Sequence, residues 1–189
     1  MEQSLPEHPV SAQPVPDTKD WTWTIRMRCP DCGLAAGTLD VLEIADRLEA
    51  AAVEWVQILT QNPAADRRPE PRVWSPLEYG AHVRDLIELY DARLVLMLVE
   101  NDPAFANWDQ DETAIASDYL SLDPDQVAAE IAGFSQTLVA RIRALEESQL
   151  ERRGFRSDGA EFTVRSFLQY FLHDVIHHLW DVTGQTAEA

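Results

Sequence analysis

The stretch Phe171-Leu172-His173-Asp174-Val175-Ile176-His177-His178-Leu179-Trp180-Asp181-Val182 combines apolar residues at helical spacing with three histidines. In a helix, His173 and His177 have their β-carbons about 5–6 Å apart, so both rings can reach one ion. His178 points away from this pair, and we expect it at the surface or behind another ligand. A metal site therefore needs a further ligand from elsewhere in the chain.

Helix signals surround this stretch. Thr163 is the expected N-cap of the helix that contains it, and Gly184 is the expected end. Apolar residues recur at three- and four-residue steps over residues 38–60, which predicts a first amphipathic helix.

Two further helices are marked by proline and capping residues. Ser75, Pro76 and Glu78 have the positions of an N-cap, a first helical residue and a reciprocal cap, so a second helix should run to about residue 100. The pair Asp123-Pro124 opens a third helix that should end near Gln149.

The predicted fold is all-α, a four-helix bundle with an irregular N-terminal extension and a long crossover between helices 2 and 3. Residues 1–37 form the extension, which contains the Cys-Pro-Asp-Cys segment, and residues 38–189 form the bundle. Residues 1–20 are proline-rich and predict a flexible arm, whereas the alternation over residues 21–27 predicts a short extended segment. The crossover covers residues 101–122 and is long enough to shape a site.

His82 lies on the apolar face of the second predicted helix, in line with Leu86 and Arg93. A single inward histidine is more often a core residue with a hydrogen-bonded ring than a metal ligand. The His173 and His177 pair changes that balance, because three imidazoles from two facing helices form an open metal site.

The segment Trp74-Ser75-Pro76-Leu77-Glu78-Tyr79-Gly80-Ala81-His82, followed downstream by His173-Asp174-Val175-Ile176-His177-His178, resembles the DinB-like superfamily of metal-binding four-helix bundles over about residues 38–184. The resemblance implies a metal triad of His82, His173 and His177 that binds a divalent ion, most commonly zinc or nickel. The superfamily includes thiol-dependent enzymes, such as mycothiol-dependent maleylpyruvate isomerase and S-transferases that use bacillithiol.

Two functions follow from the resemblance. The first is a thiol-dependent S-transferase or isomerase that joins a low-molecular-weight thiol, mycothiol or a similar one, to a small electrophile. The second is a non-catalytic metal-binding bundle of the stress response. A cation with open coordination positions would stabilise the thiolate nucleophile that the first function needs.

Four charged side chains are candidates for substrate binding, each with a structural alternative. Arg93 could clamp an acidic substrate or pair with an acid at the end of the bundle. Asp109 and Asp111 could supply a ligand or a general base or be solvated, and Arg156 could contact substrate or belong to a turn. Asp174 and Asp181 are expected to be solvated or to orient a ligand ring.

Cys29-Pro30-Asp31-Cys32 resembles half of a zinc knuckle and is a candidate for a second zinc site. His8, an acidic residue or the same pair from a second subunit could complete it, or the thiols could bind no metal. A redox dithiol is the competing interpretation. No βαβ pattern accompanies the pair, so a small structural site or reduced thiols are favoured over catalysis.

The composition limits the partners. The formal net charge of -18, from 15 basic and 33 acidic residues, argues against nucleic acid as a partner. No run of apolar residues reaches the roughly 18 that a membrane span needs, and no signal peptide is evident, so we expect a cytoplasmic protein. The tryptophan-rich N-terminal segment could also join two chains in a homodimer.

Overall fold

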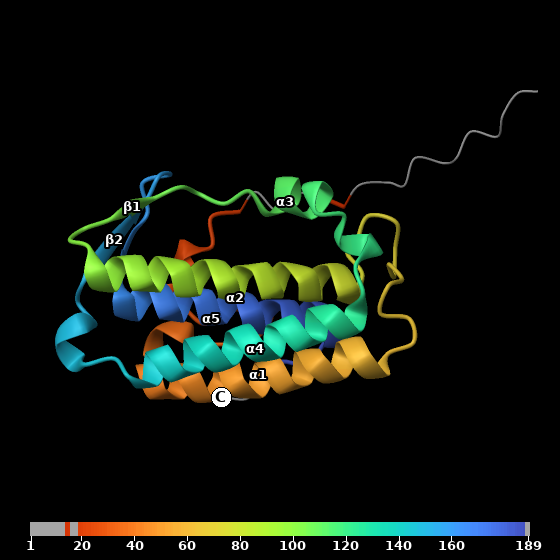
Figure 1. Cartoon of the computed structure of the whole chain (residues 1–189), viewed down its shortest axis with the longest axis horizontal. Helices are drawn as coiled ribbons and strands as arrows, with labels where there is room; N and C mark the ends of the chain where they lie inside the picture. The colour runs from red at the N-terminus through yellow and green to blue at the C-terminus, as the bar shows by residue number, and fades with distance from the viewer. Residues whose placement is uncertain (1–13, 16–18, 188–189) are drawn as a thin grey trace, which may run out of the picture.

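Four long helices form the bundle in the computed structural model, which describes residues 14, 15 and 19–187. They are α1 (Val41–Gln61), α2 (Pro76–Val99), α4 (Pro124–Arg143) and α5 (Val164–Thr183). In Figure 1, α1 and α5 run from left to right, whereas α2 and α4 run from right to left. The predicted four-helix bundle is therefore confirmed.

Helix α5 lies between α1 and α2 in the bundle. Among the four long helices, α1 packs mainly on α4 and α5, and α2 packs on the same two helices. The consecutive helices α1 and α2 contact each other much less, so they occupy opposite corners of the bundle. Neighbouring faces of α5 consequently meet different partners, which matters for the histidines on that helix.

The predicted helix starts are confirmed by their caps. Ser75 and Glu78 form a reciprocal capping box at the start of α2, and Thr163 caps α5. Helix α5 ends at Gly184, whose φ of 68° suits glycine. Helix α4 stops at Arg143, earlier than predicted, because Glu146 starts a separate 3₁₀ turn, η4 (Glu147–Gln149), by bonding Gln149.

The crossover between α2 and α4 contains more regular structure than the sequence predicts. It holds β1 (Ala104–Phe105), the short helix α3 (Gln110–Ala116) and the 3₁₀ turn η3 (Tyr119–Ser121). Strand β1 pairs in parallel with β2 (Arg153–Arg156), which pairs antiparallel with β3 (Glu161–Thr163). These strands of two to four residues are too short to give a sequence pattern.

The part of the N-terminal extension that the structure describes packs on α5. Thr22–Ile25 forms a 3₁₀ turn, η1, so the prediction of an extended segment was wrong; Trp21 and Trp23 stack on each other across its start. A second turn, η2 (Ala36–Thr38), is held by Gln169 of α5, which donates to the carbonyls of Gly37 and Leu39. The predicted flexible arm lies almost entirely outside the described residues.

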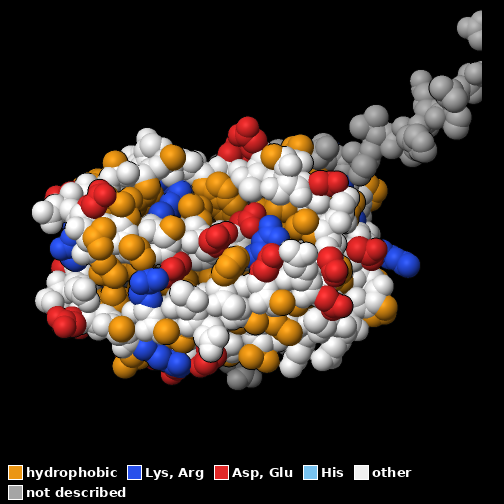
Figure 2. Space-filling view, in the orientation of Figure 1, with side chains coloured by type: hydrophobic (Ala, Val, Ile, Leu, Met, Phe, Trp, Pro, Cys, Tyr) orange, Lys and Arg blue, Asp and Glu red, His pale blue; other side chains and the backbone are white. Residues whose placement is uncertain are grey.

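Charged side chains are interleaved on the surface shown in Figure 2. Basic groups appear there as separate small clusters, several of them beside acidic groups. Ion pairs in the structure include Arg141 with Asp91 and Arg143 with Asp46. None of the helices within the described residues has the length and apolar character needed to cross a membrane.

Candidate metal centre

Two clusters of metal-ligating side chains share helix α5. We call one the Cys–His cluster; it consists of Cys29, Cys32, His173 and His177. We call the other the His–Asp cluster; it consists of His82, Asp174 and His178. Within each cluster, one ligand atom per residue lies within 4.8 Å of all the others. The predicted set of His82, His173 and His177 is thus divided between two clusters.

The division follows from the helical phase of α5. His173 and His177 occupy one stripe, and Asp174 and His178 occupy the next, about 100° round the helix. The first stripe faces the N-terminal extension and the second faces α2. From the sequence, Asp174 was expected to be solvated or to orient a ligand ring, and His178 to lie at the surface or behind another ligand, but their side chains are only 26% and 13% exposed. The crossover and α2 cover this stripe, which periodicity within α5 alone could not show.

Three ligand atoms converge in the His–Asp cluster. His178 Nε2 lies 3.0 Å from Asp174 Oδ1, and His82 Nε2 lies 3.8 Å from the same oxygen. His178 Nδ1 lies 2.8 Å from Asp181 Oδ2. Asp181 therefore holds the ring with Nε2 facing the centre of the cluster, as carboxylates behind ligating histidines commonly do.

His82 is fully buried between two tryptophans. Its ring stacks on Trp108 at a centroid distance of 5.1 Å, and Trp74 lies 5.6 Å away. Within residues 14, 15 and 19–187, neither ring nitrogen has a hydrogen-bond partner. A buried polar atom left unpaired is costly, and a bound cation would satisfy one of these nitrogens. Two imidazoles and a carboxylate are also a donor set that suits zinc or nickel.

The pKa values of the three side chains are shifted in different directions. Burial lowers the pKa of His82, which leaves the neutral imidazole that metals bind. Burial alone would raise the pKa of Asp174, but its hydrogen bond with His178 and the nearby His82 ring, whose Nε2 lies 3.8 Å away, hold it well below its usual range. For His178, burial opposes the charged form, yet hydrogen bonds to Asp174 and Asp181 raise its pKa to about 9. A cation would replace the proton that His178 carries.

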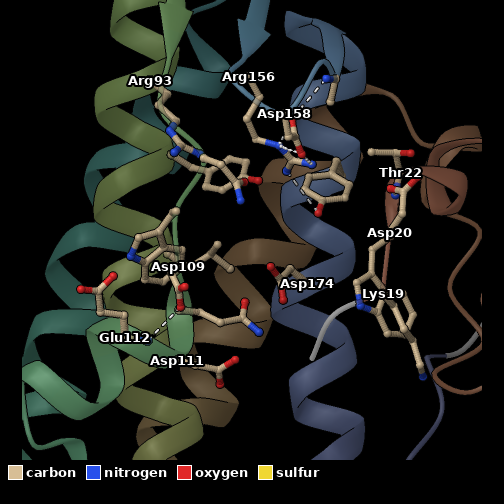
Figure 3. A pocket seen from close by; sticks show the side chains of 18 of the residues that line it. Lys19, Asp20, Thr22, Arg93, Asp109, Asp111, Glu112, Arg156, Asp158 and Asp174 are labelled. Carbon is tan, nitrogen blue, oxygen red and sulfur yellow. Dashed lines mark hydrogen bonds and ion pairs between the residues drawn. The ribbon is translucent and has the colours of Figure 1, made fainter. Parts of the chain in front are cut away.

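Asp174 also lines an open cleft with a volume of about 1250 Å³. The walls come from the N-terminal extension, α2, the crossover, the β2–β3 turn and α5. Figure 3 shows Asp174 on α5 facing the cleft, with Arg93 and Arg156 toward one end and Asp109 and Asp111 toward the other. The His–Asp cluster is therefore reached from the cleft through Asp174.

Arg93 is the more deeply placed of the two arginines in the cleft. Only 7% of it is exposed, and its Nη2 atom donates to the Ala106 carbonyl over 2.6 Å. Its guanidinium group lies 4.9 Å from the centre of the Phe105 ring. No ion pair joins it to a carboxylate of the described residues, so the structure does not give it the acidic partner considered from the sequence.

Arg156 is the last residue of β2, immediately before the turn to β3, and also lines the cleft. It pairs with Asp158 and lies within 3.5 Å of the Tyr170 hydroxyl. Its position beside the turn agrees with the first of the two roles considered from the sequence, a turn residue. A substrate contact stays a prediction.

The predicted acidic residues of the crossover lie in the cleft but outside the His–Asp cluster. Asp109 caps α3 by accepting a hydrogen bond from the Glu112 amide over 2.9 Å. Trp108, next to it, donates to Thr113 and stacks on His82. Asp109 and Asp111 line the same cleft. The crossover therefore both forms a wall of the cleft and covers one face of the His82 ring.

In the Cys–His cluster, helix α5 supplies the two histidines that lie beside the cysteines. Cys29 Sγ lies 3.7 Å from His177 Nδ1, and neither cysteine is in a disulfide. Trp21 covers the histidines, with its ring centre 4.9 Å from that of His177. Of the partners considered from the sequence, His8 lies outside the described residues. The sequence did contain a signal for this arrangement, because α5 has a second pair at helical spacing, Asp174 and His178. If that pair is grouped with His82, then His173 and His177 are left as neighbours for the two cysteines.

Comparisons with known proteins agree with this architecture. The family model of the DinB superfamily matches residues 44–182. Among solved structures, YfiT from Bacillus subtilis superimposes with a TM-score of 0.66 and 20% identity, covering 76% of this chain and 82% of that one. YfiT is described as a probable metal-dependent hydrolase with an unusual four-helix bundle topology. None of the curated proteins compared with the chain matches it. The match over most of its length shows that this chain belongs to the DinB superfamily.

Proposed function

We propose that this chain is a metal-dependent enzyme in which His82, Asp174 and His178 hold a divalent ion, zinc or nickel. The observation that carries the proposal is the double position of Asp174, which is both a member of the His–Asp cluster and part of the cleft wall. An ion bound there is accessible to a small molecule in the cleft. A non-catalytic site would not need such an opening.

In the proposed reaction, a low-molecular-weight thiol such as mycothiol adds to a small electrophile. The adduct is the product of an S-transferase, or it is an intermediate in the isomerisation of the electrophile. Three protein ligands leave open coordination positions, and a divalent cation lowers the pKa of a thiol that binds it. Asp181 keeps His178 in the ligating orientation, and Trp108 keeps water from the buried side of His82. The chain's own residues thus position the ion and leave one side open.

The cleft favours two small substrates, at least one of them anionic. Its volume of about 1250 Å³ exceeds the roughly 300–1,000 Å³ typical of sites for one small molecule. Arg93 has no acidic partner among the residues that the structure describes and is the cation best placed to bind a carboxylate. A thiol cosubstrate with carboxylate groups, or an acidic electrophile, meets both requirements.

A second candidate function is hydrolysis, which the description of YfiT favours. The same ligand set would then activate water in place of a thiol. The two functions use the same cleft and differ only in the nucleophile. A direct comparison of nucleophiles can therefore separate them.

The test is an activity screen of the chain loaded with zinc or nickel. Thiols, including mycothiol and bacillithiol, are paired with small unsaturated acids and other electrophiles, and thiol consumption and isomerisation are followed; ester and amide hydrolysis are measured in parallel. We expect turnover that depends on metal and thiol. It should fall by about 100-fold or more in Asp174→Ala, because this variant loses the metal ligand that faces the cleft.

Asp91→Asn is the control, because Asp91 lies on α2 in an ion pair with Arg141 and does not line the cleft. If the chain hydrolyses esters or amides without a thiol, hydrolysis becomes the better assignment and the thiol-dependent reaction is rejected. The absence of any metal-dependent rate would leave the non-catalytic bundle as the better interpretation.

A further inference from the structure

The Cys–His cluster has the composition of a closed metal site and shares no ligand with the proposed reaction centre, although His173 and His177 line a small pocket together with Asp174 and His178. Two thiols come from the N-terminal extension and two imidazoles from α5. The four side chains are almost completely buried, with His177 the most exposed at 8%. Four protein ligands without an open position are typical of structural zinc, in contrast to the three ligands of the His–Asp cluster.

The geometry of the turn around the cysteines favours a shared ion. The Gly33 amide donates to the Cys29 carbonyl over 3.0 Å, and the Cys29 amide donates to the Leu34 carbonyl over 2.9 Å. Gly33 has a φ of 79°, a conformation that residues with a side chain rarely adopt. This tight turn brings both sulfurs to one side, as in a zinc knuckle.

The distances and hydrogen bonding in the cluster agree with a tetrahedral ion. Bonds of about 2.3 Å to sulfur and about 2.0 Å to nitrogen place neighbouring ligand atoms roughly 3.3–3.8 Å apart. Cys29 Sγ and His177 Nδ1 are separated by 3.7 Å. His173 Nε2 is buried and has no hydrogen-bond partner in the part of the chain that the structure describes. An ion would satisfy that nitrogen.

We propose that Cys29, Cys32, His173 and His177 bind one zinc ion in a closed tetrahedral site that fastens the N-terminal extension to α5. Cysteine and histidine in this ratio favour zinc over calcium or magnesium, which prefer oxygen ligands. When zinc binds, each thiol loses its proton to solvent and both imidazoles stay neutral, so no oxidation or reduction takes place.

The site also supports one wall of the cleft. Trp21 packs against both histidines of the cluster, and the adjacent Lys19 and Asp20 line the cleft. The C-terminal segment is joined to the same point, because the Ala187 amide donates to the Cys32 carbonyl over 2.7 Å. Zinc would therefore order the extension, the end of the chain and one side of the reaction centre together.

Cobalt substitution of the wild-type chain tests the site directly. Cobalt(II) bound by thiolate gives a near-ultraviolet sulfur-to-metal charge-transfer band, which the sulfur-free His–Asp cluster cannot produce. We expect this band, together with zinc X-ray absorption of the His178→Ala variant, which lacks a ligand of the His–Asp cluster, that fits two sulfurs at about 2.3 Å and two nitrogens at about 2.0 Å. Zinc bound only by nitrogen and oxygen, or no zinc beyond that in the His–Asp cluster, would overturn the proposal.

Variants separate this site from the reaction centre. Cys32→Ser should lose the charge-transfer band, whereas His178→Ala should keep it even if the proposed enzyme activity is wrong. Asp31→Asn is the matched control, since Asp31 lies between the cysteines, is exposed and is not in the cluster. A second measurement that needs no variant is thiol titration of the native wild type with and without chelator. Thiols that react only after chelator is added support the zinc site. Two thiols that react in both samples, or a disulfide between the cysteines, contradict the zinc site.

Discussion

His173 and Asp174 are neighbours on α5, yet His173 belongs to the Cys–His cluster and Asp174 belongs to the His–Asp cluster. One residue of helix rotates the side chain by about 100°, which is enough to turn it from the N-terminal extension toward α2. The two clusters are therefore close in space but have different surroundings. One is closed by two buried cysteines and the other opens on the cleft through Asp174.

Asp181→Asn should weaken metal binding at the His–Asp cluster without changing the Cys–His cluster. Asp181 accepts from His178 and fixes the ring, and loss of such a partner typically costs 10- to 100-fold, so we expect an affinity lower by about that factor. Chelator competition measures it. Asp91→Asn is matched in burial, since both carboxylates are 21% exposed. Equal affinities in the two variants would contradict the orienting role of Asp181.

Arg93→Gln should weaken binding of small carboxylates in the cleft by about 10- to 100-fold, the range expected for one lost charge-assisted hydrogen bond. Inhibition by a series of small dicarboxylates gives the binding constants. Arg93→Lys should recover only part of the affinity, because lysine lacks the planar pair of donors. Arg141→Gln is the control, as Arg141 pairs with Asp91 and does not line the cleft. Unchanged inhibition in Arg93→Gln would remove it from the site.

Gly37→Ala and Gly133→Ala should change stability in opposite directions. A β-carbon at Gly37 would lie 2.0 Å from the Ile25 carbonyl oxygen, so the extension must shift, and we expect a loss of about 1–3 kcal/mol. A β-carbon at Gly133 of α4 meets no atom within 4 Å, and alanine should stabilise the helix by about 0.5–1 kcal/mol. Urea unfolding measures both. Similar midpoints for the two variants would show that η2 is not packed as described.

Removing metal from the Cys–His cluster should release the extension while the bundle stays folded. Arg26 and Arg28 are exposed, so trypsin should cut after them faster in chelator-treated protein. Mass spectrometry of the products over time checks this, and Cys32→Ser should behave like the chelated wild type. The His178→Ala variant should stay resistant until chelator is added. Equal cleavage rates with and without chelator would show that no ion holds the extension.

Local signals were sufficient to predict the bundle. The Ser75 and Glu78 box, the Thr163 cap and Gly184 each act within one helical turn, so their positions in sequence decide where helices begin and end. The inward position of His82 followed from the apolar face of α2 in the same way. The strands escaped prediction because β1 and β2 pair across about 50 residues and have almost no pattern of their own.

The sequence by itself determined that this chain forms four capped helices with histidines on the second and fourth. Only the tertiary structure decided which histidines act together. Cys29 and His177 meet across 148 residues, and His82 meets Asp174 and His178 because α2 and α5 pack side by side. Helical periodicity states which residues share a stripe, but the element that covers each stripe depends on the packing of distant segments. For that reason, two neighbouring stripes of one helix became parts of two different metal-ligand clusters.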